Sequence, residues 1–375
     1  MKVFVISKGM PDERYPLNGI FEFDQAKALA KVGHDVAMLV IDYRSMSYKR
    51  RYGCFVYEKD GVHVFELSLP LGIYRRALPI LQNFLVRLYK KAVKSFGKPD
   101  IIHAHFYSIA AIASVLKKRF KIPFVITEHS SKLNKNILEI SKIDARLARK
   151  AYKNADSVVA VSKALAVNLK NNFGVDAKII PNIVDVSEFQ YVKREFNAKY
   201  VFISVGNLIK IKGFDLLIEA FAEAFKDERG VMMQIVGDGP ESDNLQCLID
   251  QLGLQEQIIL LGERPRNQLN EYYQKSDAFV LASRSETFGV AFIEAMATGL
   301  PVIATACGGP NDFVDEQNGY LIPVDDKQAL VEALRKMKKN STSFNLLEIS
   351  EKCIGKFSPE NIGNALTNVY QEFIR

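Results

Sequence analysis

Short apolar runs alternate with longer amphipathic stretches along this chain. Each run spans six or seven residues and is rich in β-branched side chains, which is typical of strands buried on both faces of a parallel sheet. The first five runs cover residues 2–7, 35–41, 100–105, 123–129 and 157–162. The segments between them, such as 21–33 and 145–155, have the apolar spacing of amphipathic helices.

The rhythm breaks at "KIIPNIVDVSEF" (residues 178–189) and then starts again. The second series of apolar runs covers residues 200–206, 231–237, 257–262, 277–282 and 301–306. Two series of strands that alternate with helices predict an α/β fold with two Rossmann-like domains. We expect an N-terminal domain over residues 1–180, a C-terminal domain over 181–357 and a last helix over 358–375. Ser358 is a suitable N-cap for that helix, and Pro359 suits its first position.

Open parallel sheets bind ligands beyond the carboxyl ends of their strands. If the two domains face each other, the substrate belongs in the cleft between them. A hydrophobic content of 48% and a charged content of 25% fit a soluble globular protein. No run approaches the 18 or so apolar residues of a transmembrane helix, and the start has no signal-peptide pattern. We therefore expect a chain without either targeting element.

The charge of the chain is distributed unevenly. Residues 1–180 hold 31 Lys and Arg against 15 Asp and Glu, whereas residues 181–375 hold 19 against 28. Such asymmetry predicts an anionic partner for the first half. Nucleic acid ranks low among these partners, because aromatic residues do not interleave with the basic ones. A membrane surface or a phosphorylated acceptor remains.

Several chemistries lack their usual motifs. The four cysteines are far apart, which argues against a disulfide framework or zinc site and favours a reduced cytoplasm. There is no HExxH, Walker A loop, GxSxG elbow or DxD triplet, so we expect no metal and no cofactor. Gly237 and Gly239 form a GxG after a strand, but the third glycine of a dinucleotide fingerprint is missing.

The segment "SRSETFGVAFIEAMATG" (283–299) combines two carboxylates with an otherwise apolar run. Gly289 should open a helix whose first amides can bind an anion. Glu294, one turn into this helix, needs hydrogen-bond donors because an unpaired buried carboxylate is costly. A bound ribose diol would supply two donors. The alternatives are a structural pairing with a neighbouring arginine and a favourable interaction with the helix dipole. The sequence alone does not decide between them.

Two further loops follow strands of the same domain. Lys210 and Lys212 lie in the loop after residues 200–206, where they could neutralise a diphosphate or simply be solvated. Gly308 and Gly309 follow residues 301–306 and would let backbone amides approach a ligand, or form a plain turn. Three such features after three strands of one domain together predict a sugar-nucleotide pocket.

The N-terminal domain offers its own candidates. Gly19 lies between the first strand and the next helix, as a phosphate-side turn or an ordinary helix start. The run ending at residue 105 carries His103 and His105 on one side, and the next run ends with Glu128 and His129. Three of the chain's five histidines at adjacent strand ends favour function over structure, although their spacing does not fit a zinc site.

The helical stretch 75–98 has a basic face. Its cations oppose an apolar face, and both sets follow helical spacing: Arg87, Lys90, Lys91, Lys94 and Lys98 against Leu81, Leu85, Leu88 and Ala92. A basic amphipathic helix can lie on an anionic membrane surface. An ordinary surface helix with a solvated basic face fits equally well.

Taken together, the chain resembles glycosyltransferase family 4, retaining enzymes of the GT-B fold that include the bacterial surface-polysaccharide type. The resemblance covers nearly the whole chain. Its markers are "GIFEFDQAKALAKVGHDV", "DIIHAH", "IPNIVDVSEF", "GNLIKIKGFDLLIEAF", "IVGDGPE", "SRSETFGVAFIEAMATGLPVIAT" and "NGYLIPVDD". The pair Glu286 and Glu294, eight positions apart, is the most specific of them.

The resemblance implies a role for each matching position. Glu294 binds the donor ribose and Glu286 contacts the transferred hexose, Lys212 binds the diphosphate, and His105 lies near the reacting centre. The remaining positions surround the donor or the acceptor: amides around Phe288, Gly289 and Val290, the glycines Gly19, Gly308 and Gly309, and His129 on the acceptor side. The last helix crosses back to the N-terminal domain.

One position departs from the family pattern. Asn207 stands where the family often has arginine after the strand glycine, so Lys212, alone or together with Lys210, must stabilise the leaving diphosphate. The resemblance implies retention through front-face attack, with no carboxylate nucleophile. We expect a hexosyltransferase that uses a UDP-sugar, or a GDP-sugar, and a glycan or lipid-diphosphate-linked acceptor at the inner membrane face. A nucleotide-sugar 2-epimerase and a non-catalytic sugar-nucleotide-binding subunit are the alternatives.

Overall fold

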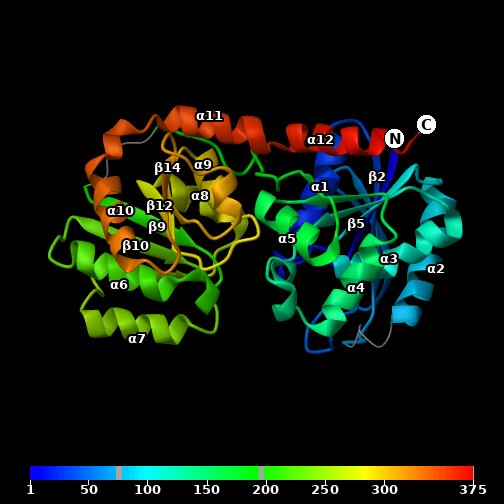
Figure 1. Ribbon diagram of the computed structural model, residues 1–375, viewed down its shortest axis with the longest axis horizontal. Coiled ribbons are helices and arrows are strands. Elements are labelled where there is room, and N and C mark those ends of the chain that lie inside the picture. The colour runs from blue at the N-terminus through cyan, green and yellow to red at the C-terminus, as the bar shows by residue number, and fades with distance from the viewer. Residues whose placement is uncertain (73–77, 194–197, 375) are drawn as a thin grey trace. The chain divides into compact units, whose positions relative to one another are not determined.

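The computed structural model describes residues 1–72, 78–193 and 198–374 (Figure 1). It divides into two compact units, the first formed by Met1–Ile183 with Pro359–Arg375 and the second by Val184–Ser358. Each unit has its own sheet and its own helices. The chain therefore begins in unit 1, forms the whole of unit 2, and contributes its last helix to unit 1.

Unit 1 is built on an eight-stranded sheet with the order β3-β4-β2-β1-β5-β6-β7-β8. The strands are β1 Lys2–Ser7, β2 Asp35–Asp42, β3 Gly53–Lys59, β4 Val62–Ser68, β5 Ile101–His105, β6 Phe124–Glu128, β7 Ser157–Ala160 and β8 Lys178–Ile179. All neighbours pair in parallel except β3 and β4. The central strands are buried along almost their whole length, which explains why their sequences are continuously apolar.

The helices of unit 1 cover this sheet. They are α1 Ile20–Lys31, α2 Leu78–Phe96, α3 Tyr107–Phe120, α4 Lys142–Tyr152, α5 Lys163–Phe173 and α12 Pro359–Gln371, with short 3-10 turns η1 Ser131–Leu133 and η2 Ile137–Glu139. Helix α12 packs against α1 (Figure 1). Its buried residues Ile362, Leu366 and Tyr370 join the core formed by β1, β2 and α1.

Unit 2 repeats the plan with a six-stranded parallel sheet of order β11-β10-β9-β12-β13-β14. The strands are β9 Tyr200–Val205, β10 Val231–Val236, β11 Ile258–Gly262, β12 Ala278–Leu281, β13 Val302–Thr305 and β14 Gly319–Ile322. The helices are α6 Phe214–Phe225, α7 Ser242–Leu252, α8 Arg266–Gln274, α9 Val290–Ala297, α10 Lys327–Lys339 and α11 Leu346–Phe357, with turns η3 Lys210–Lys212, η4 Gly309–Asp312 and η5 Ser341–Ser343. Helix α6 contacts α7 and α10, and α9 contacts α11 (Figure 1).

In each sheet the strand order reverses at one point. In unit 1 the chain runs outward from β1 to β2 and then returns to place β5 on the other side of β1. In unit 2 the same reversal occurs between β9 and β12. Ligands of doubly wound sheets bind beyond the carboxyl ends of the strands at such switch points. These two pairs of loops are therefore the first candidates for a ligand-binding site.

The hairpin formed by β3 and β4 is an addition to the predicted strands. Asp60 and Gly61 both have positive φ, 50° and 75°, in the tight turn between the two strands. An Asp-Gly pair in such a turn matches the twist of the flanking strands. The hairpin extends the sheet of unit 1 by two strands, and β4 pairs with β2.

Candidate functional site

Three loops of unit 2 are joined at the carboxyl edge of its sheet. They follow the neighbouring strands β9, β12 and β13. The amide of Arg284 donates to the carbonyl of Ile211 at 2.7 Å, which links the first loop to the second. Glu286 forms a parallel bridge with Gly308, which links the second loop to the third. The switch point of unit 2 is thus a continuous surface of three loops.

Lys212 and Glu286 form an ion pair on this surface. Nζ of Lys212 lies 2.6 Å from Oε1 of Glu286, and the same oxygen accepts a hydrogen bond from Oγ of Ser283 at 2.8 Å. The two side chains are only 22% and 9% exposed. The structure therefore brings together two of the three predicted catalytic residues, and adds Ser283 as a hydroxyl donor that fixes the carboxylate.

The second carboxylate, Glu294, lies in α9 and pairs with an arginine. Nε of Arg266 donates to Oε1 of Glu294 at 3.1 Å and also lies 3.3 Å from Oε2 of Glu188. This is the arginine alternative that the sequence left open. It does not exclude a ribose, because a carboxylate offers about four acceptor positions. Arg266 and Glu188 extend the polar environment of Glu294.

The amides at the start of α9 are placed by a glycine. Gly289 adopts φ 94°, a left-handed conformation that favours glycine, and α9 begins at the next residue, Val290. The ring of Phe288 packs in a core cluster with Phe313 and Phe357. Any part that Phe288 plays in binding a ligand therefore falls to its backbone.

The glycine loop after β13 lies against the same turn. A Cβ on Gly309 would stand 2.2 Å from the carbonyl oxygen of Phe288, so any side chain here would push the two loops apart. The amide of Gly309 donates to the carbonyl of Glu286 at 3.0 Å. Gly308 has φ 130° and precedes it. The two glycines thus fix the distance between the β12 and β13 loops.

Asn207 and Lys210 are the other two residues of the predicted diphosphate loop. Asn207 is exposed at the start of that loop. Lys210 is exposed too, and its carbonyl accepts a hydrogen bond from Arg284. Neither side chain joins the ion pair of Lys212 and Glu286 among the contacts of the described residues.

In unit 1, the three predicted histidines form one buried stack. His103 and His105 stack with ring centres 4.5 Å apart, which agrees with the predicted alternation along β5. His105 and His129 also stack, and Nδ1 of His105 lies 3.0 Å from Nε2 of His129. The other buried nitrogen of His105, Nε2, has no hydrogen-bond partner among the described residues. A ligand could therefore pair with this nitrogen of His105.

The neighbouring polar groups hold the stack in place. His103 contacts Oγ1 of Thr127 at 2.7 Å and the hydroxyl of Tyr370 at 2.6 Å, so its role is structural. Burial lowers the pKa of His103 and of His129 to about 3, and burial beside two other rings lowers the pKa of His105 well below its usual value. All three imidazoles are therefore neutral at pH 7.

Glu128 is the last residue of β6 and accepts a hydrogen bond from the amide of His129, which follows it. Burial raises its pKa to about 7, although hydrogen bonds from Tyr152 and from the amides of Ser130, Tyr107 and His129 oppose the rise. The carboxyl group ties α3 and α4 to the end of β6: its Oε2 accepts from the amide of Tyr107 and the hydroxyl of Tyr152, both at 2.8 Å. It organises the loop that carries His129.

Gly19 stands before α1 in the switch-point loop of unit 1. It has φ 78°, and a Cβ there would lie 2.2 Å from the carbonyl oxygen of Gly9. The loop after β1 thus folds back on itself, with its two glycines in contact. Gly19 allows this close backbone approach, and its predicted role beside a phosphate stays a prediction.

The basic helix α2 begins at Leu78 in the described part of the chain, and residues 75–77 of the predicted stretch lie outside it. Leu81, Leu85, Leu88 and Ala92 are buried, whereas Arg87, Lys90, Lys91 and Lys94 are exposed. Lys98 is a correction: α2 ends at Phe96, and Gly97 has φ 93°, so Lys98 is not on the helix. Among the residues that the structure describes, no helix is long and apolar enough to span a bilayer.

Comparison with known protein families decides what these two units are. A model described as Glycosyltransferase Family 4 matches residues 23–188, and one described as Glycosyl transferases group 1 matches residues 186–354. The chain is a group 1 glycosyltransferase of family 4. It is 29% identical over 355 residues to a Bacillus subtilis (strain 168) protein, TuaC, whose name describes a teichuronic acid biosynthesis glycosyltransferase. That alignment covers 89% of this chain and 88% of the relative.

Solved structures show that this glycosyltransferase has the GT-B fold. Sucrose-phosphate synthase from Thermosynechococcus elongatus superposes with a TM-score of 0.81 at 20% identity, covering 99% of this chain and 98% of the other. Anabaena Alr3699/HepE in complex with UDP superposes with a TM-score of 0.73 at 20% identity, covering 99% of each chain. The predicted fold class and family are thereby confirmed.

Proposed function

We propose that this glycosyltransferase moves a hexose-type sugar from a nucleotide-diphosphate donor, UDP-linked in the first place, to a glycan or lipid-linked glycan acceptor with retention at the anomeric carbon. Unit 2 binds the donor and unit 1 the acceptor. The observation that carries the proposal is the pair of Lys212 and Glu286 at the switch point of unit 2. The UDP-bound relative HepE supports the choice of donor.

In this proposal the diphosphate binds at Lys212 and the amides that begin α9. A lysine is a point charge suited to phosphate oxygens, and a helix start offers unpaired amides and a partial positive charge. Both groups lie on the joined loops of unit 2, near Gly308 and Gly309. They stabilise the charge that develops on the leaving phosphate when the bond to the sugar breaks.

The two carboxylates divide the rest of the donor between them. Glu286 accepts hydrogen bonds from the hydroxyls of the sugar, held in position by Ser283 and Lys212. Glu294 accepts from the ribose diol, with Arg266 holding its other side. Neither carboxylate acts as nucleophile. The leaving phosphate takes the acceptor proton as the acceptor attacks from the same face.

In unit 1, His105 supplies a contact to the transferred sugar or the acceptor hydroxyl. Its buried Nε2, without a protein partner among the described residues, supports this role, because an unsatisfied buried polar nitrogen is costly until a ligand pairs with it. The 3.0 Å contact between Nδ1 of His105 and Nε2 of His129 holds the ring of His105 in its orientation. Gly19 lets the loop after β1 present its backbone to a phosphate.

The exposed cations of α2 further suggest peripheral contact with an anionic membrane at the cytoplasmic face. Four cations lie on the exposed side of this helix, opposite its buried apolar face. A helix of this kind binds anionic headgroups through electrostatic attraction. A lipid-linked acceptor would then be within reach of the enzyme, and the similarity to TuaC fits assembly of a surface polysaccharide.

A thermal-shift screen of UDP, GDP, ADP and CMP, followed by their sugars, tests the donor. A ligand that binds the folded state at a hundred times its Kd adds about 2.7 kcal/mol to its stability. We expect the largest shift from UDP and its sugars. Proton NMR of the hydrolysis of the best UDP-sugar then tests the reaction: a retaining enzyme releases the α-anomer first from an α-linked donor. Release of the β-anomer contradicts retention, and conversion of the donor to an isomer without sugar release identifies an epimerase.

A further inference from the structure

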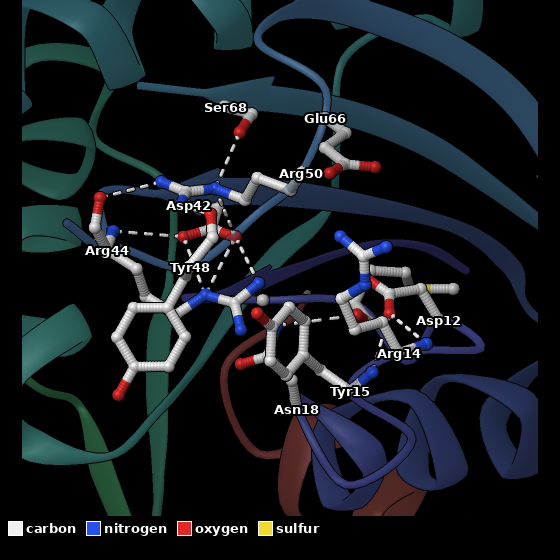
Figure 2. A network of polar contacts seen from close by, with 12 residues as sticks. Asp12, Arg14, Tyr15, Asn18, Asp42, Arg44, Tyr48, Arg50, Glu66 and Ser68 are labelled. Carbon is white, nitrogen blue, oxygen red and sulfur yellow. Dashed lines mark hydrogen bonds and ion pairs between the residues drawn. The ribbon is translucent and has the colours of Figure 1, made fainter. Parts of the chain in front are cut away.

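The loop between β2 and β3 of unit 1 has an unusual composition. Residues 43–52, "YRSMSYKRRY", carry four basic side chains and three tyrosines but no acidic one. The loop follows Asp42, the last residue of β2, at the carboxyl edge of the sheet. The other loops at this edge include residues 8–18 after β1. The two loops form one polar network (Figure 2).

Arg50 holds the loop in shape. Its Nε donates to Oγ of Ser68 at 2.9 Å and lies 3.1 Å from Oδ2 of Asp42. Its Nη1 donates to the carbonyl of Ser45 at 3.0 Å, and its Nη2 to the carbonyl of Leu69 at 2.9 Å. The side chain is 6% exposed. Every guanidinium nitrogen is therefore used within the protein, and Arg50 is a structural residue.

Arg44 is held differently. It contacts Asp42 with Nε 3.0 Å and Nη2 2.7 Å from Oδ2, as Figure 2 shows. Its guanidinium lies over the rings of Tyr15 and Tyr48, 4.6 Å and 5.1 Å from their centres. Among the hydrogen bonds of residues 1–72, 78–193 and 198–374, none involves its third nitrogen, Nη1. Arg44 is thus fixed in place while one edge of its guanidinium is left for a ligand.

The loop after β1 completes the surface. The rings of Tyr15 and Tyr48 meet edge to face with centres 5.6 Å apart, and Nη1 of Arg14 donates to the carbonyl of Lys49 at 3.2 Å. Oδ1 of Asp12 accepts from the amides of Arg14 and Tyr15, at 2.8 Å and 2.7 Å, which folds this loop. Tyr15 and Tyr48 therefore lie on two loops that are held in place by hydrogen bonds of Asp12, Arg14 and Arg50.

The surface has a surplus of positive charge. Residues 8–18 and 42–52, together with Glu66, whose carboxyl group interacts electrostatically with Arg44, carry six basic and four acidic side chains. Of the acids, Asp42 is buried between two arginines. Arg14, Lys49 and Arg51 are exposed. An anion that approaches this edge of the sheet is attracted by several positive charges. It can then bind the guanidinium of Arg44, which Asp42 already holds in position.

We propose that this surface, centred on Arg44, Tyr15 and Tyr48, binds an oxyanion of the acceptor, a carboxylate or a phosphate, and so makes the enzyme selective for acidic acceptors. The inference rests on the proposed function, because it deepens the acceptor role of unit 1. Arginine suits planar recognition of carboxylate and phosphate, and a tyrosine ring offers a flat face and a hydroxyl to the adjoining sugar. Arg50 positions the loop without touching the ligand.

Binding of three probes to the full-length chain tests the proposal: trigalacturonic acid, its neutral counterpart galactotriose, and farnesyl diphosphate. Isothermal titration at low and at high NaCl concentration measures each. We expect at least one of the two acidic probes to bind about tenfold or more tighter than galactotriose, and to weaken at high salt because exposed cations are screened. The acidic probe that binds identifies the source of the oxyanion. Equal binding of acidic and neutral probes, or no binding of either acid, overturns the proposal.

Three variants locate the site. Arg44→Gln removes the prepared guanidinium, and we expect it to weaken binding of the acidic probe about tenfold or more. Lys49→Gln with Arg51→Gln removes two exposed charges without touching Asp42, and should weaken it about threefold or more even if Arg44→Gln disturbs the loop. Arg119→Gln, at an exposed arginine near the end of α3, removes the same charge as Arg44→Gln and should have no effect. Equal losses in all three mean unspecific attraction and overturn the assignment.

UDP binding, measured on the same proteins, separates this inference from the proposed function. Loss of the acidic probe with unchanged UDP affinity supports an acceptor site in unit 1. Absence of UDP binding from the wild type contradicts the proposed donor, while the comparison of acidic and neutral probes still decides whether the arginine surface recognises an oxyanion.

Discussion

Lys212 and Glu286 meet across the switch point of the second sheet, with 2.6 Å between Nζ and Oε1, although 74 residues separate them in the sequence. One follows β9 and the other β12, the two strands between which the order reverses. In the proposed donor complex, Lys212 faces the anionic diphosphate and Glu286 faces the hydroxyl groups of the sugar. Each charge can then change partner when the ligand binds.

Substitution of either partner should reduce catalysis by different routes. Lys212→Ala should weaken UDP binding about tenfold or more, because a phosphate contact is lost. Glu286→Ala should leave UDP affinity within about threefold but cut hydrolysis of the UDP-sugar about tenfold or more, because it contacts the sugar. Titration calorimetry with UDP and sugar release measured by NMR separate the two effects. Exposed Lys226 in the same unit, changed to Ala, is the control. Near-normal hydrolysis by both variants contradicts the site.

The same pair should also affect stability. Removing one partner leaves a largely buried charge without its counter-ion, which costs about 1–3 kcal/mol here because Lys212 retains some contact with solvent. The double variant Lys212→Met with Glu286→Gln should lose less free energy of unfolding than the sum of the losses in Lys212→Met alone and Glu286→Gln alone. Urea unfolding of the four proteins gives the coupling energy. If the losses of unfolding free energy are strictly additive, the ion pair makes no net contribution to stability.

Glu294 should determine recognition of the ribose. We expect the wild type to bind UDP at least about tenfold more tightly than 2′-deoxy-UDP. The deoxy ligand lacks one of the two hydroxyl groups that donate to the carboxylate of Glu294. Glu294→Gln should bind both ligands with similar affinity. Because Arg266 contacts the same carboxylate, a matched variant, Arg266→Lys, shows whether orientation of Glu294 matters. If Glu294→Gln still prefers UDP over 2′-deoxy-UDP as strongly as the wild type does, Glu294 has only a structural role.

The buried histidines should make unit 1 less stable at acidic pH. The unfolded chain protonates imidazoles near pH 6.5, whereas the folded chain keeps His103 and His129 neutral down to about pH 3 and His105 neutral well below 6.5. The unfolded state therefore binds more protons in this range, and stability falls as the pH is lowered through it. Glu128 opposes this effect: its pKa of about 7 means that the folded state keeps a proton that the unfolded chain loses above about pH 4.5, so its contribution falls as pH rises.

Three histidines outweigh one carboxyl group below pH 6.5. Between about pH 7.0 and pH 5.5 we expect a loss of about 2 kcal/mol from unit 1. Urea unfolding followed by pulse proteolysis, with fragments of unit 1 assigned by mass, measures it. His129→Gln should reduce the pH dependence, whereas His63→Gln, at an exposed position in β4, should not. A stability that is flat across this range contradicts the neutral stack.

Gly19→Ala should disturb the loop after β1 more than its backbone angle alone explains. Gly174 has a similar conformation, φ 69° against 78°, but open space where a Cβ would stand. Gly174→Ala should cost about 1 kcal/mol, the energy of the left-handed conformation. Gly19→Ala adds a steric overlap with Gly9 and should cost about 1–3 kcal/mol more. Thermal unfolding of both variants gives the difference, and equal losses would mean that the loop relaxes freely.

Membrane contact through α2 should depend on its exposed cations. Cosedimentation with vesicles of phosphatidylcholine containing about 30 mol% phosphatidylglycerol measures it. Lys90→Glu with Lys94→Glu should reduce the bound fraction about tenfold or more, since each basic residue near an anionic surface contributes about 1 kcal/mol. Lys336→Glu with Lys339→Glu, at two exposed positions in the last turn of α10, is the matched control. Equal binding to pure phosphatidylcholine would refute electrostatic docking.

Much of this fold could be predicted from the sequence, because strands buried on both faces leave continuous apolar runs. The start of α9 at Gly289 was equally visible from the glycine before an apolar segment. The apolar pattern does not predict the hairpin of β3 and β4, although Asp60 and Gly61 are a recognisable turn pair. Strand β3 is largely exposed, so its apolar pattern is weak.

The partners of the site residues could not be predicted in the same way. Arg266 lies 28 positions before Glu294 in another helix, and only the tertiary fold brings the two together. The arginine and tyrosine surface of unit 1 depends on Asp42 at a strand end and on a loop braced by Arg50. Side-chain contacts between distant loops leave no periodic signal, whereas the residue types that form them are visible once the loops are known to meet.

The hydroxyl of Tyr370 reaches His103 in the middle of the first sheet. This contact has a consequence for biosynthesis. The core of unit 1 includes residues from the last helix, so a ribosome must translate all of unit 2 before the first unit can be completed. Until then the face of α1 that receives α12 stays uncovered. The N-terminal unit should therefore stay partly folded throughout translation, and its core should close only after the last helix has been made.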